Sequence, residues 1–227
     1  MIGLFDSGVG GLTALKEVRR LLPKVDITYL ADRKNAPYGT KDADEILSLA
    51  QKNISLLRDA GASRILIACC TASTLYPRLS AADKEISIPI ILPAAEAAAR
   101  TTASGRIAVI ATHATVRSRA FSRAISSLGG FKVAEFDAQP LVAMVEAGAR
   151  DGTALNVGEL CELERILIPI RSFEADTLIL GCTHFPHLKE HIGGLLPGIA
   201  LINPSLEGAL KVVNPTPADE SGRTVYL

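Results

Sequence analysis

The sequence contains no tryptophan, and Phe, Tyr and Trp together make up only 4% of its 227 residues. Hydrophobic residues nevertheless account for 48% of the chain. We therefore expect a sizeable core that is built mostly from aliphatic side chains. A chain of this length can form one large domain or two small ones.

An excess of charge of either sign is also lacking. The 24 basic and 24 acidic residues give a formal net charge of 0, so the basic surplus typical of nucleic-acid or anionic-membrane binding is missing. No apolar run reaches the roughly 18 residues of a membrane-spanning helix. The start of the chain has neither the basic region nor the cleavage site of a signal peptide. We expect a cytoplasmic protein without nucleic-acid or membrane partners.

Cysteines are few, and none forms a C-x-x-C pair. Cys69, Cys70, Cys161 and Cys182 are too sparse for a disulfide scaffold, which favours free thiols in a reducing compartment. Cys161 lies in a helical pattern and is interpreted as an inert or surface residue. Three of the cysteines and His184 are zinc-ligand types, but their spacing matches no common zinc motif, so no metal is predicted.

Runs of β-forming residues alternate with helical patterns of roughly 10–15 residues. This alternation predicts an α/β fold with parallel sheets and helices on both faces. The rhythm occurs twice, with a boundary near Leu92 to Ala94. We assign residues 1–92 and 204–227 to a first α/β domain and residues 93–203 to a second. A cleft is expected between the carboxyl ends of their strands.

Several local predictions accompany this division. Asp42 and Glu45 resemble a capping box that opens a helix ending near Asp59. The apolar run 88–93 has a proline near each end and predicts an edge strand or a crossing point of the chain. One helix is predicted from Val116 to Leu128, and another from Asn156 to Phe173 with a break near Pro169.

Two predicted strands end in the same way. Ile65-Leu66-Ile67 leads through Ala68 into Cys69-Cys70-Thr71, and Thr177 to Leu180 leads through Gly181 into Cys182-Thr183-His184. A buried parallel strand of this kind delivers reactive side chains to the mouth of a sheet. A helix start after each cysteine would lower the pKa of its thiol.

Two further side chains belong to the same predicted site. His184 can exchange a proton with Cys182. Asp6 ends the first strand and would either assist Cys69, bind an ammonium group or cap the following helix.

Two thiols facing a cleft suit two kinds of chemistry. One is redox chemistry through a disulfide. The other is proton abstraction from one face of a carbon with proton donation to the opposite face. A single Cys–His pair would instead favour acyl transfer, and the sequence has no G-x-S-x-G elbow.

The loop Ser7-Gly8-Val9-Gly10-Gly11 presents backbone N–H groups at the start of a helix. It matches neither G-x-G-x-x-G nor the P-loop, so it indicates a carboxylate-binding loop or a plain tight turn.

Four motifs resemble those of glutamate racemases in the aspartate/glutamate racemase superfamily. They are D-S-G-V-G-G-L at 6–12, P-Y-G at 37–39, A-C-C-T-A-S at 68–73 and G-C-T-H-F-P at 181–186. The resemblance covers almost the whole chain. It implies two pseudo-symmetric α/β domains and a cofactor-independent, homodimeric enzyme that interconverts L- and D-glutamate and so supplies peptidoglycan synthesis.

The resemblance also implies roles for individual residues. Cys69 and Cys182 resemble the two catalytic thiols, and Asp6 and His184 resemble the residues that assist them. The implied substrate-binding residues are Ser7, Pro37, Tyr38, Gly39, Cys70, Thr71, Thr112, Thr115 and Thr183. Glu146 matches an acidic position close to the site, although a solvated helix carboxylate fits the sequence equally well.

The chain departs from the family pattern at two places. Cys70 stands where the family usually has an Asn, whose amide is expected to bind substrate, and a thiol is a much weaker hydrogen-bonding group. Family members also usually continue past a strand like Thr224 to Leu227 into a final helix. Three alternatives to glutamate racemisation stay open: racemisation of aspartate or another small acid, binding without turnover, and thiol redox chemistry that pairs Cys69 with Cys70 or Cys182.

Overall fold

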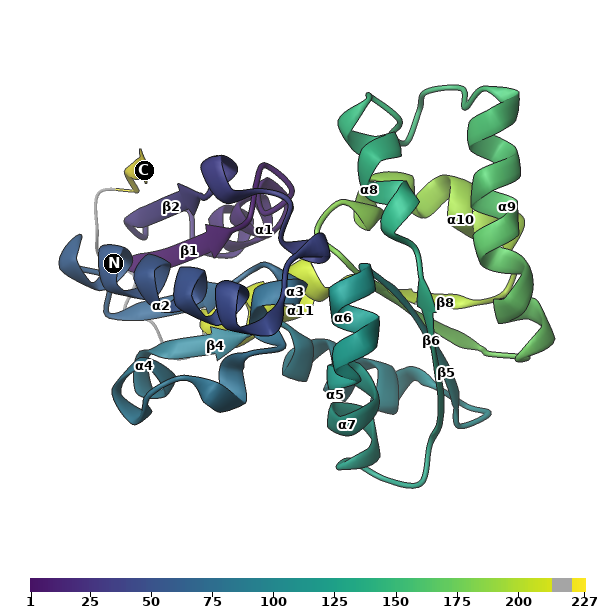
Figure 1. Cartoon of the computed structure of the whole chain (residues 1–227), viewed down its shortest axis with the longest axis horizontal. Helices are drawn as coiled ribbons and strands as arrows, with labels where there is room; N and C mark the ends of the chain where they lie inside the picture. Colours follow the sequence, from purple (N-terminus) through teal and green to yellow (C-terminus); the bar gives the residue numbers. More distant parts are fainter. Residues whose placement is uncertain (214–221) are drawn as a thin grey trace.

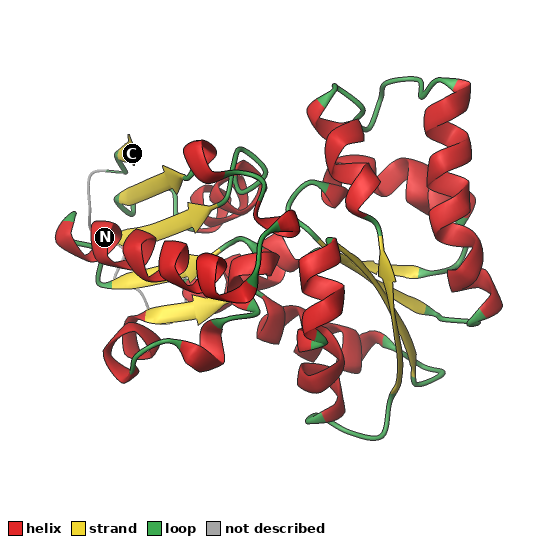
Figure 2. Cartoon of the chain, in the orientation of Figure 1, coloured by secondary structure: helices red, strands yellow, loops and turns green. Residues whose placement is uncertain are grey.

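The computed structural model describes residues 1–213 and 222–227 and contains two parallel sheets, each flanked by helices (Figures 1 and 2). Residues 214–221, a polar stretch with two prolines in the sequence, lie outside the described residues. The fold class predicted from the sequence is confirmed. Among the described residues, no helix is both long enough and apolar enough to cross a membrane.

The first sheet has five strands in the order β4-β3-β1-β2-β9. Its strands are β1 (Ile2–Asp6), β2 (Ile27–Ala31), β3 (Arg64–Ile67), β4 (Ser87–Pro89) and β9 (Thr224–Tyr226). All five residues of β1 are buried, as expected for a central strand covered on both faces.

The second sheet has four strands in the order β6-β5-β7-β8. Its strands are β5 (Arg106–Ala111), β6 (Lys132–Asp137), β7 (Thr177–Gly181) and β8 (Ala200–Ile202). Here β7, which leads into Cys182, pairs along its length with β5, so the loops that follow these two strands emerge side by side.

Helices connect the strands and cover both faces of each sheet. The longer ones are α1 (Leu12–Leu21), α2 (Ala43–Asp59), α5 (Ile91–Thr101), α8 (Gln139–Glu146), α9 (Val157–Ser172) and α11 (Pro204–Val212). The shorter ones are α3 (Cys70–Ser73), α4 (Ala81–Ile86), α6 (His113–Ser118), α7 (Ala120–Ser126) and α10 (Lys189–Leu195). Single 3-10 turns are η1 (Arg33–Asn35), η2 (Tyr38–Thr40), η3 (Tyr76–Arg78) and η4 (Phe185–Leu188).

A continuous apolar cluster joins the two sheets. Leu66 of β3 and Ile179 of β7 belong to it, together with Ala94 of α5 and Ala209 of α11. Figure 1 shows α5 and α11 in the middle of the molecule, between the strands of the first sheet and those of the second. The core is mainly aliphatic, as predicted, with a few aromatic side chains such as Phe5 and Phe121 fully buried.

Local differences from the sequence predictions have clear physical causes. The run 88–93 forms an edge strand only as far as Pro89, because α5 begins at Ile91 and holds Pro93 in its first turn, where a proline needs no N–H partner. The predicted break in the helix at Pro169 is wrong, since α9 continues to Ser172. The predicted helix 116–128 is two helices, because Arg119 adopts a left-handed conformation with φ of 55° between α6 and α7.

The predicted helix cap at Asp42 is confirmed in part. Its side chain accepts a hydrogen bond from the Glu45 N–H at 2.8 Å. The Glu45 side chain instead pairs with Lys41 at 2.6 Å.

Candidate active site

The carboxyl ends of β1, β3, β5 and β7 surround one small cavity between the two sheets. Its free volume of about 30 Å³ has room for one or two water molecules. All of the site residues predicted from the sequence line it except Asp6, Thr115 and Thr183, which are buried immediately behind it. The two sheets therefore bring together side chains that are more than 100 positions apart.

Cys69 follows β3 and directly precedes α3. Its Sγ accepts a hydrogen bond from the Ala72 N–H at 3.5 Å and donates one to Ser7 Oγ at 3.6 Å. Burial, reinforced by the nearby Asp6 carboxylate, raises the pKa of the Cys69 thiol to about 11. The expected lowering of this pKa by the helix start is wrong in sign overall, because the Ala72 N–H offsets only part of the burial.

Asp6 is fully buried at the end of β1. Burial raises the pKa of its carboxyl group above the usual value, while His184, the N–H groups of Gly8 and Gly11 and the Thr183 hydroxyl act in the opposite direction. Thr183 Oγ1 donates to Asp6 Oδ1 at 3.3 Å, and the Gly8 N–H donates to Oδ2 at 3.0 Å. Asp6 thus links the first sheet to the loop that follows β7.

Cys182 follows β7 in the second sheet, with its Sγ 3.6 Å from Nδ1 of His184. Burial also raises the pKa of this thiol, with smaller contributions from Cys69 and Asp6. The other ring nitrogen of His184, Nε2, is buried and lies 3.3 Å from Oε1 of Glu146, although the two atoms are not aligned as a hydrogen bond. Glu146 is half-exposed, so it places a carboxylate between the imidazole and solvent.

Gly10 brings the first loop close to this imidazole. A Cβ atom at position 10 would lie 2.4 Å from Thr183 Oγ1 and 2.9 Å from His184 Nδ1. Any larger residue would push the loop away from the second sheet, which explains a glycine at this position.

Three buried threonines form a hydroxyl triangle across the two sheets. Thr71 Oγ1 lies 2.9 Å from Thr112 Oγ1 and 3.2 Å from Thr115 Oγ1, and the last two are 2.9 Å apart. Thr71 follows β3, whereas Thr112 and Thr115 follow β5. Three neutral groups that can each donate or accept a hydrogen bond therefore meet beside Cys69 and Cys70.

The Tyr38–Thr40 turn forms one wall of the cavity and is held rigidly. Tyr38 is buried, its hydroxyl donates to Asp32 Oδ2 at 2.5 Å and it accepts from Asn53 Nδ2 at 3.1 Å. Pro37 and Gly39 line the cavity on either side of it.

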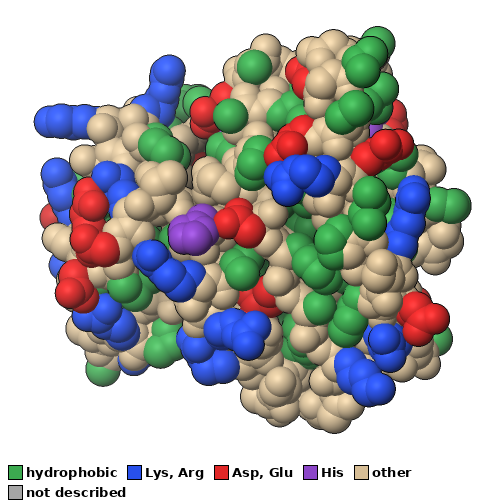
Figure 3. Space-filling view, turned by 45° about the vertical axis from the view of Figure 1, so that its right-hand side comes forward, with side chains coloured by type: hydrophobic (Ala, Val, Ile, Leu, Met, Phe, Trp, Pro, Cys, Tyr) green, Lys and Arg blue, Asp and Glu red, His purple; other side chains and the backbone are tan. Residues whose placement is uncertain are grey.

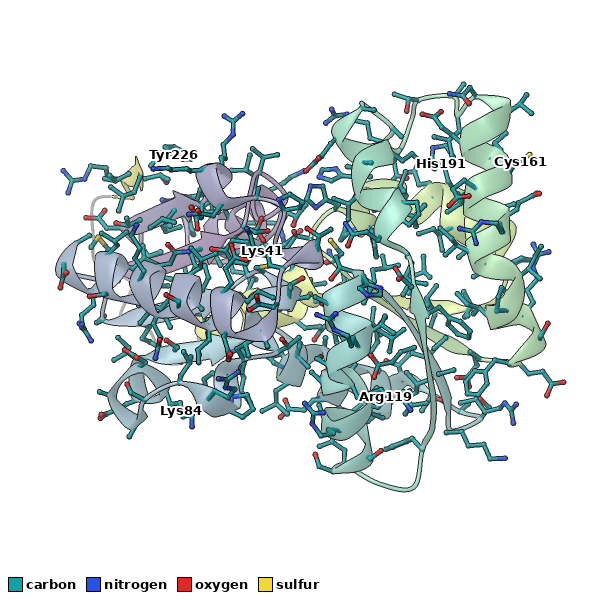
Figure 4. The ribbon with its side chains drawn as sticks, in the orientation of Figure 1. Lys41, Lys84, Arg119, Cys161, His191 and Tyr226 are labelled. Carbon is teal, nitrogen blue, oxygen red and sulfur yellow. The ribbon has the colours of Figure 1, made fainter. Side chains whose placement is uncertain are left out.

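Cys70 is buried and lines the cavity, and burial raises the pKa of its thiol well above the usual value. The position therefore offers a neutral thiol, which is a weak hydrogen-bonding group. Cys161 is exposed on α9 and points away from the junction of the two sheets (Figure 4). All four cysteines are free thiols.

Three residues that line the cavity were not predicted: Ala36, Gln139 and Val142. Gly8 also lines it and was predicted only as part of the loop at residues 7–11. Gln139 was the most accessible to sequence reasoning, because it lies in the short connection between the strand that residues 131–136 indicate and the helix that residues 140–147 indicate. The carboxyl end of that strand shares the edge of the sheet that holds Cys182.

The face of the molecule shown in Figure 3 has mixed charge. Basic, acidic and apolar side chains are interspersed on it, in line with the formal net charge of 0. Within the part of the chain that the structure describes, no three His, Cys, Asp or Glu side chains are grouped to hold a metal ion.

The sequence and the structure both match known proteins over most of the chain. The family model described as Asp/Glu/Hydantoin racemase matches residues 14–211. A glutamate racemase of Desulforudis audaxviator is 41% identical over 207 residues, which cover 90% of this chain and 74% of the relative. A glutamate racemase of Exiguobacterium sibiricum is 39% identical over 220 residues, covering 93% and 78%.

Solved structures give the same result. A glutamate racemase of Bacillus anthracis superposes with a TM-score of 0.88 at 30% identity, covering all of this chain and 86% of that protein. A glutamate racemase of Francisella tularensis in complex with D-glutamate superposes with a TM-score of 0.87 at 30% identity, covering 99% and 86%.

Proposed function

The chain belongs to the Asp/Glu/Hydantoin racemase family, and from this membership together with the two-thiol cavity we propose that it interconverts L- and D-glutamate. The observation that carries the proposal is the position of Cys69 and Cys182. They line one cavity and come from different sheets. Inversion of a stereocentre needs a proton-transfer group on each face of the carbon, and two sheets facing one cavity supply this arrangement.

We propose that the thiols act as a pair. One is a thiolate that removes the α-proton, and the opposite thiol then delivers its proton to the other face of the carbanion. After one turnover the thiolate has become a thiol and the thiol a thiolate, so no proton is consumed overall. A second turnover in the same direction requires protons to move back.

Asp6 and His184 are the groups proposed to move those protons. Asp6 is buried behind Cys69, with a pKa raised by burial, so it holds a proton more readily than a solvated carboxylate. His184 lies against Cys182 and reaches toward the half-exposed Glu146, which provides an exit to solvent.

Neutral donors would stabilise the charge that develops on the substrate. Ser7, Thr71 and Thr112, each of which carries a hydroxyl group, line the cavity. Fixed dipoles of this kind stabilise a carbanion-like transition state strongly where water is excluded.

Proton NMR in deuterated water with L-glutamate and then L-aspartate, together with a chiral assay, tests the proposal. Loss of the α-proton signal and appearance of the D-enantiomer of glutamate is the expected result. If aspartate alone is inverted, the family chemistry holds and the substrate is the smaller acid. If the folded protein exchanges neither α-proton, the racemase proposal is wrong and a binding function replaces it.

Single substitutions test the two-thiol mechanism, with Cys161→Ser as a matched control at an exposed thiol. Cys69→Ser and Cys182→Ser are each expected to lose most of the racemisation, whereas Cys161→Ser keeps it. Parent rates in both active-site variants would refute the mechanism.

The cellular context is part of the same proposal. We assign the D-glutamate product to peptidoglycan synthesis in the cytoplasm and propose a homodimer. Light scattering of the purified protein tests the dimer, and rescue of a D-glutamate auxotroph tests the supply of the product.

A further inference from the structure

The cavity has a second distinctive property besides its thiols, which is the absence of a fixed positive charge. Of the described residues that line it, none is Lys or Arg. Lys41 follows the Tyr38–Thr40 turn, but its ammonium group is paired with Glu45 at 2.6 Å. A substrate with two carboxylates must therefore be held mainly by neutral donors.

Gln139 is the only carboxamide among the described residues that line the cavity. It occupies the first position of α8 and is half-buried. Its own N–H donates to Asp137 Oδ1 at 2.9 Å, and the other oxygen of Asp137 lies 2.8 Å from His113 Nδ1. The backbone of Gln139 is therefore anchored to the end of β6.

The side chain of Gln139 reaches across the mouth to the first domain. Its Oε1 accepts a hydrogen bond from the His113 N–H at 3.4 Å. A Cβ atom added to Gly39 would lie only 2.4 Å from the same oxygen, so the carboxamide packs directly on the Tyr38–Thr40 turn. With the oxygen held in this way, the NH₂ group has no hydrogen-bond partner among the described residues.

We propose that Gln139 is a substrate-binding residue that selects dicarboxylic amino acids, its NH₂ group donating to the substrate carboxylate that lies beside the Tyr38–Thr40 turn. This inference rests on the proposed racemase function. Cys70 is a weak hydrogen-bonding group. Gln139 of α8 would supply to the substrate the carboxamide that position 70 lacks.

Steady-state kinetics of Gln139→Met and Gln139→Glu with L- and D-glutamate test the inference, alongside calorimetric binding of D-glutamate. Methionine keeps the length of the side chain and removes the donor, and the expected result is a KM about ten-fold or more above the parent value with a much smaller change in kcat. Glutamate at this position keeps the size and adds a negative charge beside the substrate carboxylate, so its KM is expected to rise further.

The matched controls are Gln51→Met and Gln51→Glu on the exposed surface of α2, which should keep the parent KM. Melting temperatures near that of the parent protein show that the variants are folded, and if Gln139→Met does not fold, the isosteric Gln139→Glu alone decides the outcome.

A parent protein that racemises glutamate, combined with unchanged KM and unchanged binding in the Gln139 variants, would overturn this inference and leave the racemase proposal standing. A parent protein without turnover would overturn the racemase proposal, and calorimetry would still decide whether Gln139 binds the ligand.

Discussion

Each active-site thiol is more basic than a thiol in water. A stronger base accepts a proton from a weakly acidic carbon more easily. A Cys69 pKa of about 11 therefore reduces the difference in pKa between the thiol and the α-carbon of the substrate. The same shift reduces the fraction of thiolate at neutral pH. The buried Asp6 and His184 lie beside the thiols and can accept the proton that a thiol loses when it becomes a thiolate.

The raised pKa predicts how Cys69 reacts with an alkylating reagent. In a Cys161→Ser background, iodoacetamide labelling of Cys69 should keep increasing steeply through pH 9 and 10, because half of the thiol is ionised only at about pH 11. Peptide mass spectrometry measures the site and the rate. A labelling rate that is half-maximal near pH 9, the ordinary pKa of a thiol, would show that the pKa of Cys69 is not raised.

The raised pKa of Cys69 also makes the free energy of unfolding depend on pH. The folded protein keeps the Cys69 proton to a higher pH than the unfolded chain does, so the contribution of this group is complete below about pH 9 and is lost as the pH rises toward 11.

Substitution of Cys70 by Asn is expected to increase the racemisation of glutamate. Cys70→Asn would place a carboxamide among buried groups that line the cavity, and one added hydrogen bond to a charged substrate is worth about 1–3 kcal/mol. We expect kcat/KM for glutamate to rise by about one to two powers of ten. Cys161→Asn, at an exposed position of α9, serves as the control. Glutamate kinetics identical to those of the parent would contradict the prediction.

At the scale of elements, the break between α6 and α7 depends on one residue. Arg119 has a φ of 55°, a conformation that costs an L-residue roughly 1–2 kcal/mol and costs glycine little. It lies at the end of α6, exposed to solvent (Figure 4).

Arg119→Gly is therefore expected to raise the free energy of unfolding by about 0.5 kcal/mol, after the greater freedom of glycine in the unfolded chain is deducted. Arg117→Gly, at an exposed position inside α6, should lower it by about 1 kcal/mol. Urea unfolding of both variants gives the comparison. A loss of stability in Arg119→Gly as large as that in Arg117→Gly would show that the break is not strained.

The elements also show what periodicity can and cannot predict. The strands were predicted well because apolar runs that end in Gly, Asp or Cys have few other interpretations in a parallel sheet. The break at Arg119 was not predicted, because neither proline nor glycine marks it. Pro169 was given too much weight, since α9 has only three further residues after it and tertiary packing of Ile166 and Ile170 holds the helix together.

Some residues of the site could be predicted from the sequence and others could not. Cys69, Cys182 and His184 stood out because reactive residues immediately follow strands. Gln139 and Val142 did not, because their contribution depends on how α8 packs over the cavity rather than on any motif.

For the whole molecule, binding is linked to stability. A ligand present at 100 times its Kd stabilises the folded state by about 2.7 kcal/mol, which for a chain of this size raises Tm by about 5–10 °C. We expect this shift with saturating D-glutamate, and no shift with L-lysine at the same concentration and ionic strength, since its side chain ends in an ammonium group. Differential scanning fluorimetry measures both. Equal shifts with the two amino acids would indicate a salt effect and contradict specific binding.

The assignment of residues 1–92 plus 204–227 to one domain and 93–203 to the other is a proposal at this same scale. Native-state hydrogen exchange of the two sheets tests it, since two domains should lose their protection in separate steps and a single unit in one step.

The order of the strands has a consequence for synthesis on the ribosome. The outer edge of β2 is completed only by β9, through pairs such as Ile27 with Thr224 and Tyr29 with Tyr226, and the rings of the two tyrosines meet edge to face with centroids 6.1 Å apart. At about 5–20 residues per second, roughly 10–40 s separate the emergence of these two strands. During that interval the nascent chain presents an unpaired strand edge, to which a neighbouring chain on the same message can bind. Pairing with β9 thus ends the period in which this strand edge is open to association with another chain.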